Sequence, residues 1–173
     1  MMTVITGGSG SGKSEYAEDR TLQYSKDNLI YIATMVAFDE EAKRKIERHR
    51  RMRSEKNFTT KECYIGLEKL ELKNNYTVLL DCMSNLVANE LYQENGAGND
   101  TVKCVVEGVR HLKNQVKNLV IVTNEVFSDG ILYDEETMRY ISYLGEINQQ
   151  LAAMADEVVE VVYGIPLICK ATK

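Results

Sequence analysis

Proline is almost absent from this chain of 173 residues, which contains one proline and 11 glycines. A proline-rich or glycine-rich linker would need more of both residues, so we expect a single domain over residues 1–173. No apolar run approaches the roughly 18 residues that a membrane-spanning helix requires, and we therefore expect no membrane span. A glycine-rich motif begins at residue 7, which leaves no room for a signal peptide, so we expect a cytoplasmic protein.

Closely spaced metal ligands are also missing. The four cysteines, Cys63, Cys82, Cys104 and Cys169, are far apart and include no C-x-x-C pair. This spacing argues against a zinc site and indicates no disulfide framework, so we expect buried, reduced thiols.

The chain has no overall excess of positive charge, since its formal net charge is −5. This argues against a general nucleic-acid-binding protein. The charge is uneven, however, because residues 43–56 hold eight Lys or Arg against two Glu, a local +6 that leaves −11 for the rest. A positive segment on an acidic protein predicts an anionic ligand.

A phosphate-binding loop of the form G-x-x-x-x-G-K-[ST] is present near the start of the chain. It consists of Gly7, Gly8, Ser9, Gly10, Ser11, Gly12, Lys13 and Ser14. A strand-forming run precedes it and a helix-forming run follows, the order that the motif needs; the alternative is a Gly/Ser turn that matches by chance. Lys13 should reach the β- and γ-phosphates of a bound nucleotide, and the Ser14 hydroxyl should ligate Mg²⁺. The N-terminus of the following helix should face the anion.

Apolar runs at residues 28–34, 76–82 and 118–126 indicate strands buried on both faces of a parallel sheet. The third run carries the polar residues Asn124 and Glu125 near its end. We expect helices at 14–24, 39–55, 83–92, 100–115 and 135–155, a short strand at 58–64 and an amphipathic stretch at 65–72. Residues 156–163 and 165–170 should pair across Gly164 as an antiparallel hairpin. The predicted fold class is therefore α/β, a P-loop NTPase whose mostly parallel sheet is covered by helices on both faces and ends in a C-terminal antiparallel hairpin.

Ligands of parallel sheets bind beyond the carboxyl ends of the strands. At that edge we expect Thr34, Met35 and Val36 beside the phosphate loop. Asp81 ends another buried run and is placed to hold Mg²⁺, usually through water, as a Walker-B residue. The alternative for Asp81 is an N-cap of the next helix.

The positive segment has the pattern of a helix with acidic residues in its first turn. Lys45, His49 and Arg53 follow one another at intervals of four and share one face of that helix. Cationic neighbours should lower the pKa of His49 and keep the imidazole neutral, the form that can attack phosphorus. The alternatives are a solvated basic helix or a nucleic-acid-binding patch with an incidental histidine.

Several motifs occur in an order known from one protein family. They are Thr6-Gly7-Gly8-x-x-Ser11-Gly12-Lys13-Ser14, Tyr31-Ile32-Ala33-Thr34, Ile46-x-x-His49-x-x-x-Arg53, Glu62, Val122-Thr123-Asn124-Glu125-Val126 and Gly145-x-x-Asn148-Gln149-x-Leu151-Ala152-x-x-Ala155-Asp156-Glu157-Val158. Over nearly its whole length the chain resembles the bifunctional adenosylcobinamide kinase/adenosylcobinamide-phosphate guanylyltransferase family. The phosphate loop alone would not indicate this family; the basic histidine helix and the two asparagine-containing motifs are far more specific.

The resemblance implies a RecA-like sheet, a homotrimer and two reactions of cobalamin biosynthesis. ATP or GTP would phosphorylate a hydroxyl of the corrinoid adenosylcobinamide, and GTP would then guanylylate that phosphate to give adenosylcobinamide-GDP and pyrophosphate. In the family the histidine of the basic helix carries GMP, and His49 matches it. The GTP contacts that the resemblance implies are Gly7 to Ser14, Thr34, Met35, Val36, Arg50, Arg51, Met52, Arg53, Glu62 and Asp81.

The chain departs from the family pattern at several positions, including Ser54 in place of a common proline and Phe58 in place of a common tryptophan. Residues 127–130 replace a glycine-rich turn and a proline, and Met138, Ile141 and Ser142 stand where members tend to carry an Arg and an Arg-Asp pair. Two other functions stay open. One is a different small-molecule P-loop kinase or NTPase in which His49 only clamps phosphate, and the other is a nucleotide-sensing binding protein whose basic helix docks nucleic acid or a partner.

Overall fold

The computed structural model describes residues 1–53 and 56–172; residues 54, 55 and 173, and the side chains of Lys45, His49, Met52 and Arg53, lie outside the described part. Its strands are β1 (Met2–Thr6), β2 (Leu29–Ala33), β3 (Phe58–Glu62), β4 (Thr77–Asp81), β5 (Asn118–Val122), β6 (Glu157–Val162) and β7 (Ile165–Ala171). Its α-helices are α1 (Lys13–Tyr24), α2 (Glu40–Arg53), α3 (Met83–Tyr92), α4 (Thr101–Gln115) and α5 (Glu135–Met154), with short 3-10 helices η1 (Leu67–Lys69) and η2 (Gly98–Asp100).

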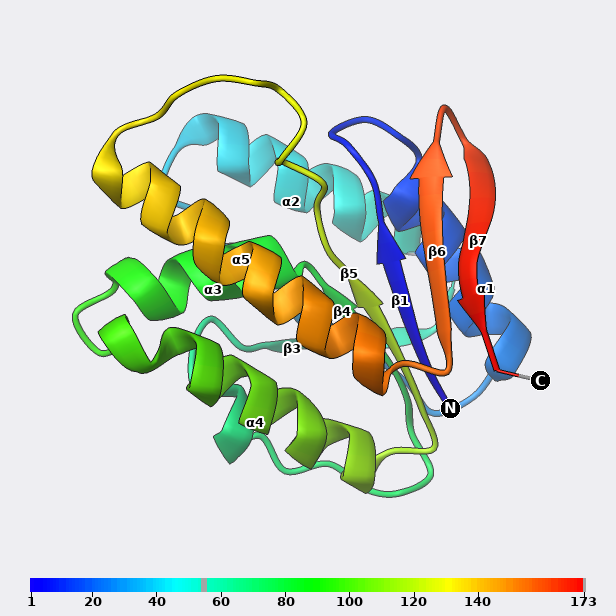
Figure 1. Ribbon diagram of the computed structural model, residues 1–173. Coiled ribbons are helices and arrows are strands. Elements are labelled where there is room, and N and C mark those ends of the chain that lie inside the picture. Colours follow the sequence, from blue (N-terminus) through cyan, green and yellow to red (C-terminus); the bar gives the residue numbers. More distant parts are fainter. Residues whose placement is uncertain (54–55, 173) are drawn as a thin grey trace.

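The strands form one sheet in the order β3-β2-β4-β5-β1-β6-β7 (Figure 1). Neighbouring strands are parallel except β6 and β7, which pair antiparallel. The predicted α/β class and the C-terminal hairpin are therefore confirmed. Asp81 of β4 is in register with Val122 of β5 and Ala33 of β2, and Ile5 of β1 also lies beside Val122. The carboxyl ends of these four strands thus lie along one edge of the sheet.

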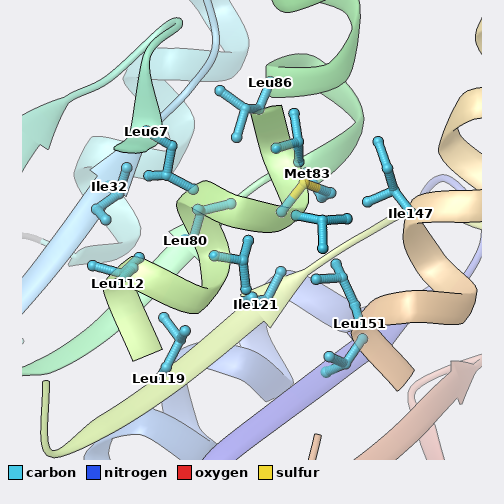
Figure 2. Close-up of a cluster of buried hydrophobic side chains, with 14 of the residues drawn as sticks. Ile32, Leu67, Leu80, Met83, Leu86, Leu112, Leu119, Ile121, Ile147 and Leu151 are labelled. Carbon is cyan, nitrogen blue, oxygen red and sulfur yellow. The ribbon is translucent and has the colours of Figure 1, made fainter. Parts of the chain in front are cut away.

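Helices cover both faces of the sheet, as the apolar runs predicted. Helix α1 packs on one face, where Ala17 joins a buried cluster with side chains such as Leu79 and Val120. Helices α3, α4 and α5 cover the other face, and Figure 2 shows Met83, Ile147 and Leu151 converging on the strand residues Leu80 and Ile121. Each such fully buried side chain contributes about 1.5–3 kcal/mol through the hydrophobic effect. The two clusters hold the sheet rigidly, so the strand ends have fixed positions.

The C-terminal hairpin supports the phosphate loop. Tyr163 and Gly164 both have positive φ angles, 52° and 78°, as a tight two-residue hairpin turn requires. The backbone N–H of Gly164 donates a hydrogen bond of 2.8 Å to the carbonyl of Ser11. Gly7 also lies against the hairpin, because a Cβ atom added to Gly7 would be 2.5 Å from the carbonyl oxygen of Val161 in β6. The hairpin therefore fixes the loop from the side of the sheet.

Two expected elements are shorter than the sequence indicated. The strand expected at 118–126 ends at Val122, and the chain then turns so that the N–H of Glu125 donates to the carbonyl of Gly7 at 3.1 Å. The stretch at 65–72 forms only the short helix η1. None of the described helices combines the length and the apolar character that crossing a bilayer demands.

All four cysteines are free, but they are not all buried, so that expectation was wrong in part. Cys63 and Cys82 are buried, Cys104 is partly buried, and Cys169 is exposed because it lies on the edge strand β7. The Cys104 thiol donates to Glu68 at 3.4 Å, and burial and this contact raise its pKa to about 12. Although its sulfur lies within 4.8 Å of carboxylate oxygens of Glu68 and Glu90, it is a neutral thiol.

Candidate active site

The phosphate loop borders a cavity of about 530 Å³ at the carboxyl edge of the sheet. The cavity is lined by loop residues from Ser9 to Ser14 and, from other elements, by Met35, Arg48, Asp81, Asn85 and Asn124. The Nζ atom of Lys13 donates a hydrogen bond of 2.9 Å to the carbonyl of Gly8. Burial lowers the pKa of Lys13 below its usual 10.5, while Asp81 and Cys82 act in the opposite direction. A bound phosphate would replace the carbonyl as the partner of this ammonium group.

Asp81 ends β4 in the same cavity as the hydroxyl-bearing Ser14. The Tyr31 hydroxyl donates a hydrogen bond of 3.1 Å to its Oδ2 atom, and both residues are buried. The N-cap of α3 is Cys82 and no side chain caps that helix, so Asp81 is not its N-cap. A carboxylate and a hydroxyl are oxygen ligands of the kind that Mg²⁺ prefers, and the predicted metal residues Ser14 and Asp81 fit such an ion.

A second cavity of about 230 Å³ adjoins the first, with Met35, Asp81 and Asn85 lining both. Its walls come from β2, β3 and α2 and include the predicted residues Arg50 and Glu62. An Arg50 guanidinium nitrogen lies 3.6 Å from Oε1 of Glu62, and both side chains are more than half exposed. The pKa of Tyr64, another lining residue, is raised by burial and by a hydrogen bond to Glu62. The second cavity thus offers aromatic rings and a carboxylate close to the phosphate-binding end.

Five predicted contacts among the described residues line neither cavity, namely Gly7 and Gly8 of the phosphate loop, Thr34, Val36 and Arg51. Thr34 is fully buried, and its hydroxyl donates to the carbonyl of Cys82 and accepts from the N–H of Cys82, both at 2.8 Å. It therefore joins the end of β2 to the turn after Asp81. Val36 is only partly buried, and Arg51 lies 4.0 Å from Glu47 on the same helix.

Helix α2 runs beside both cavities. Arg48 lines the phosphate cavity, whereas Arg50, two residues later, lines the second cavity. His49 stands between them in the chain, but its side chain lies outside the described part, as do those of Met52 and Arg53. Position 49 therefore belongs to the part of α2 that borders both cavities.

Several lining residues were missed by reasoning from the sequence. Tyr31 belongs to an apolar run and had the appearance of a core residue, although it bonds Asp81. Asn85 lies in the first turn of α3, just after the end of β4, a place in the chain that could have indicated that it lies at the same edge of the sheet. Arg48 and Lys43 were counted in the positive segment without a specific role, and the structure places them on different cavities.

Comparison with known proteins gives matches over nearly the entire chain. The family model of cobinamide kinase / cobinamide phosphate guanyltransferase matches residues 3–169. The bifunctional adenosylcobalamin biosynthesis protein CobU of Escherichia coli K12 is 34% identical, covering 95% of this chain and 97% of that protein. The bifunctional adenosylcobalamin biosynthesis protein CobP of Pseudomonas aeruginosa is 28% identical, covering 98% of both chains. Among solved structures, the flagellar accessory protein FlaH of Methanocaldococcus jannaschii aligns with a TM-score of 0.48 at 14% identity, over 99% of this chain and 78% of that one.

Proposed function

The chain belongs to the cobinamide kinase / cobinamide phosphate guanyltransferase family and is an enzyme with nucleotide-dependent activities, and we propose how its residues perform two successive reactions. In the first, ATP or GTP phosphorylates a hydroxyl of adenosylcobinamide. In the second, GTP transfers GMP to the resulting phosphate, giving adenosylcobinamide-GDP and pyrophosphate. The corrinoid is a small-molecule partner, and no nucleic acid takes part.

The kinase step uses the phosphate cavity. The loop N–H groups hold the nucleotide phosphates, and the Lys13 ammonium turns from the Gly8 carbonyl to the transferred phosphate. Ser14 and Asp81 would hold Mg²⁺, which supplies charge neutralisation on the phosphate oxygens. The acceptor oxygen forms a bond to the γ-phosphorus, the bond to the bridging oxygen breaks, and the nucleoside diphosphate leaves.

The guanylyl step uses His49 as nucleophile. Its neutral imidazole attacks the α-phosphorus of GTP, a nitrogen–phosphorus bond forms, and pyrophosphate leaves. Cations of α2 such as Arg48 and Arg50 stabilise the charge on the departing pyrophosphate. An oxygen of cobinamide phosphate then attacks the same phosphorus, and His49 is released.

One observation supports the proposed two-step function best. The phosphate cavity and the second cavity adjoin, because Met35, Asp81 and Asn85 line both. In our proposal, a nucleotide whose phosphates lie on the loop extends its base into the second cavity, which Glu62 and residues of α2 line. A carboxylate can accept hydrogen bonds from two N–H groups of guanine, whereas adenine offers no such pair. Glu62 therefore favours GTP over ATP in the guanylyl step.

The decisive experiment is intact mass measurement after incubation with GTP and Mg²⁺. We expect wild-type protein to gain the mass of one GMP in an acid-labile, base-stable linkage, and His49→Ala to gain nothing. His111→Ala is the matched control, since His111 is the other histidine and lies on α4. Kinase activity should survive in His49→Ala, because phosphorylation of the hydroxyl needs no covalent enzyme intermediate.

Two results would contradict the proposal. Wild-type protein that never gains GMP would favour a plain P-loop kinase or NTPase in which His49 clamps phosphate. An adduct that persists in His49→Ala would place the nucleophile elsewhere.

We also propose a homotrimer. Support comes from the edge strand β7, on which Ile165, Leu167 and Ile168 are between 48% and 67% exposed. A row of apolar side chains on an open sheet edge is a common feature of subunit contacts. Light scattering should give a mass three times the 19.6 kDa of one chain, and Ile168→Lys should lower it; a wild-type mass of 19.6 kDa would refute the trimer.

A further inference from the structure

A third cavity, of about 420 Å³, lies between helix α5 and the loop that joins it to β5. In Figure 1 this loop arches from the carboxyl end of β5 to the start of α5. Val126, Tyr140 and Ile141 give the cavity an apolar wall, and Asn124, Glu125 and Ser128 give it a polar one. The proposed nucleotide site uses the phosphate cavity and the second cavity, so the third cavity is free for another ligand.

The third cavity opens onto the phosphate cavity, since Ser9 and Asn124 line both. The position of Asn124 is fixed because its Nδ2 donates to the Ser84 hydroxyl at 2.7 Å. The phosphate cavity therefore joins the second cavity through Met35, Asp81 and Asn85, beside β2 and β3, and joins the third cavity through a different pair, Ser9 and Asn124, beyond the ends of β1 and β5. Phosphoryl transfer needs the acceptor and the nucleoside on opposite sides of the transferred phosphate, because the entering and leaving oxygens are in line. This arrangement leaves the third cavity to the acceptor.

The walls of the third cavity match an amphipathic alcohol. Tyr140 is held in place because its hydroxyl donates to the carbonyl of Ser84 at 3.3 Å. In the loop that supplies part of the cavity wall, Phe127, Ile131 and Leu132 are 44%, 57% and 94% exposed. Exposed apolar side chains gathered beside a cavity mark a ligand-binding surface. A polar arm can enter the cavity while a large, flat, apolar body lies on the loop outside.

Glu125 is a cavity residue whose backbone is hydrogen-bonded to the phosphate loop. Its backbone N–H donates to the carbonyl of Gly7 at 3.1 Å, and its Oε1 accepts from the N–H of Phe127 at 2.9 Å and from the Ser128 hydroxyl at 2.7 Å. These bonds fix a carboxylate in the wall of the third cavity, next to the phosphate loop. A carboxylate in that place can accept the hydrogen bond of an attacking hydroxyl.

We propose that the third cavity binds the hydroxyl-bearing arm of the acceptor alcohol, with Glu125 orienting the hydroxyl toward the γ-phosphate. The inference rests on the proposed kinase function. When the acceptor oxygen bonds to the γ-phosphorus and the nucleoside diphosphate departs, the hydroxyl proton passes to the Glu125 carboxylate and then to water. Glu125 touches the reacting atoms and is a catalytic residue of the kinase step only.

Filling the cavity tests its occupant. Ile141→Trp places a large side chain in the cavity, and Met138→Trp, one turn earlier on α5 and not among the cavity residues, is the matched control. We expect Ile141→Trp to raise the KM for cobinamide at least about tenfold while Met138→Trp leaves it unchanged. Both variants should bind GTP with wild-type affinity. Ser128→Trp, which fills the cavity from the loop, should act like Ile141→Trp and provides a second test should Ile141→Trp fold poorly.

Glu125→Gln tests the catalytic role, because the amide oxygen can still accept the bonds from Phe127 and Ser128. We expect the kinase kcat to fall about 10²-fold with little change in the KM for cobinamide. Formation of the GMP adduct should be unaffected. An unchanged kcat would remove Glu125 from the reaction.

The outcomes separate this inference from the proposed function. If wild-type protein phosphorylates cobinamide but Ile141→Trp and Ser128→Trp keep the wild-type KM for cobinamide, the acceptor does not bind in the third cavity. If wild-type protein hydrolyses GTP and leaves cobinamide unphosphorylated, the proposed function itself is wrong, and the inference falls with it.

Discussion

The hydroxyl of Tyr31 donates a hydrogen bond of 3.1 Å to Oδ2 of Asp81, joining β2 to β4 at the carboxyl edge of the sheet. Tyr31 is 4% exposed, and its ring packs edge-on against Phe58 with centroids 6.4 Å apart. A buried hydroxyl that bonds one carboxylate oxygen restricts the rotation of that carboxylate. The residue proposed to hold Mg²⁺ is thus oriented by a side chain from the neighbouring strand.

Asp81→Asn should lower turnover about 10²-fold, of the order seen when a preorganised electrostatic group is removed. Nucleotide affinity should change only a few-fold, because the phosphate loop holds most of the anion. Tyr31→Phe keeps the packing and should cause a smaller loss with a higher half-saturating Mg²⁺ concentration, since a hydrogen bond to a charged group contributes about 1.5–3 kcal/mol. Turnover and nucleotide affinity measured across a Mg²⁺ titration check both variants. Equal loss of turnover and affinity in Asp81→Asn would indicate a structural role.

Lys13→Ala should abolish both activities and leave the fold intact. The Nζ atom donates a hydrogen bond to the carbonyl of Gly8 in the loop, and its charge acts on phosphates and not on the core. Circular dichroism should be unchanged, and kinase and guanylyl assays should show the loss. A variant that retains wild-type rates would refute the role of the phosphate loop.

Gly7→Ala should destabilise the protein, because the new Cβ atom would lie 2.5 Å from the carbonyl oxygen of Val161 and 2.7 Å from the hydroxyl of Ser11. The expected cost is about 1–3 kcal/mol. Gly8→Ala is the control, since no atom lies within 4 Å of its added Cβ, and its stability should change by less than about 0.5 kcal/mol. Urea unfolding of the two variants gives the comparison. Equal stabilities would show that the hairpin does not press on the loop.

Lys56→Met should destabilise the protein by roughly 3 kcal/mol, because Glu18 is fully buried and its carboxylate bonds Lys56 at 2.8 Å. Burial alone would lower the pKa of Lys56, but the hydrogen bond and the charge of Glu18 and Asp19 raise it above the usual 10.5. The stabilisation is therefore complete below that value and is lost as the pH rises through the raised pKa. Unfolding free energies of wild type and variant should differ at neutral pH and converge at high pH. Substitution of the exposed Lys26 by Met is the control.

Nucleic acid should not bind at physiological salt, although residues 43–56 carry a local charge of +6. Binding to several phosphates would fall steeply with salt, and the segment belongs to a chain of net charge −5. A gel shift at sub-micromolar protein in about 150 mM salt, where the Debye length is about 8 Å, is the measurement. A shifted band would favour the nucleotide-sensing binding protein.

The sequence predicted the order and type of nearly all elements, because long apolar runs and a glycine-rich loop are direct signals of buried strands and phosphate binding. The expected strand was carried too far, to Val126, because residues 123–126 follow an apolar run directly. In the structure β5 ends at Val122, and the N–H of Glu125 bonds the carbonyl of Gly7 in the phosphate loop. Hydrophobicity reports burial and does not report the hydrogen-bond partner.

The site could be predicted only in part for a related reason. Position at a strand end correctly placed Met35 and Asp81, but it could not tell that the Thr34 side chain is buried against Cys82. Tyr31 and Asn85 reach the cavities through the packing of β2 and α3, which depends on contacts between segments far apart in the chain. The sequence alone therefore does not show that Tyr31 and Asn85 line the site, because it does not show which strands are neighbours.

The place of β1 in the sheet has a consequence for protein synthesis. β1 lies between β5 and β6, so Met2 pairs with Leu119 and Thr3 with Glu157. While a ribosome makes the chain, the first strand has no neighbour until residue 118 and those after it emerge, and the Gly164 contact to Ser11 forms later still. Contacts between such distant segments form slowly. The nascent chain therefore carries its phosphate loop long before β5, β6 and the hairpin turn, which hold that loop in place, have been made.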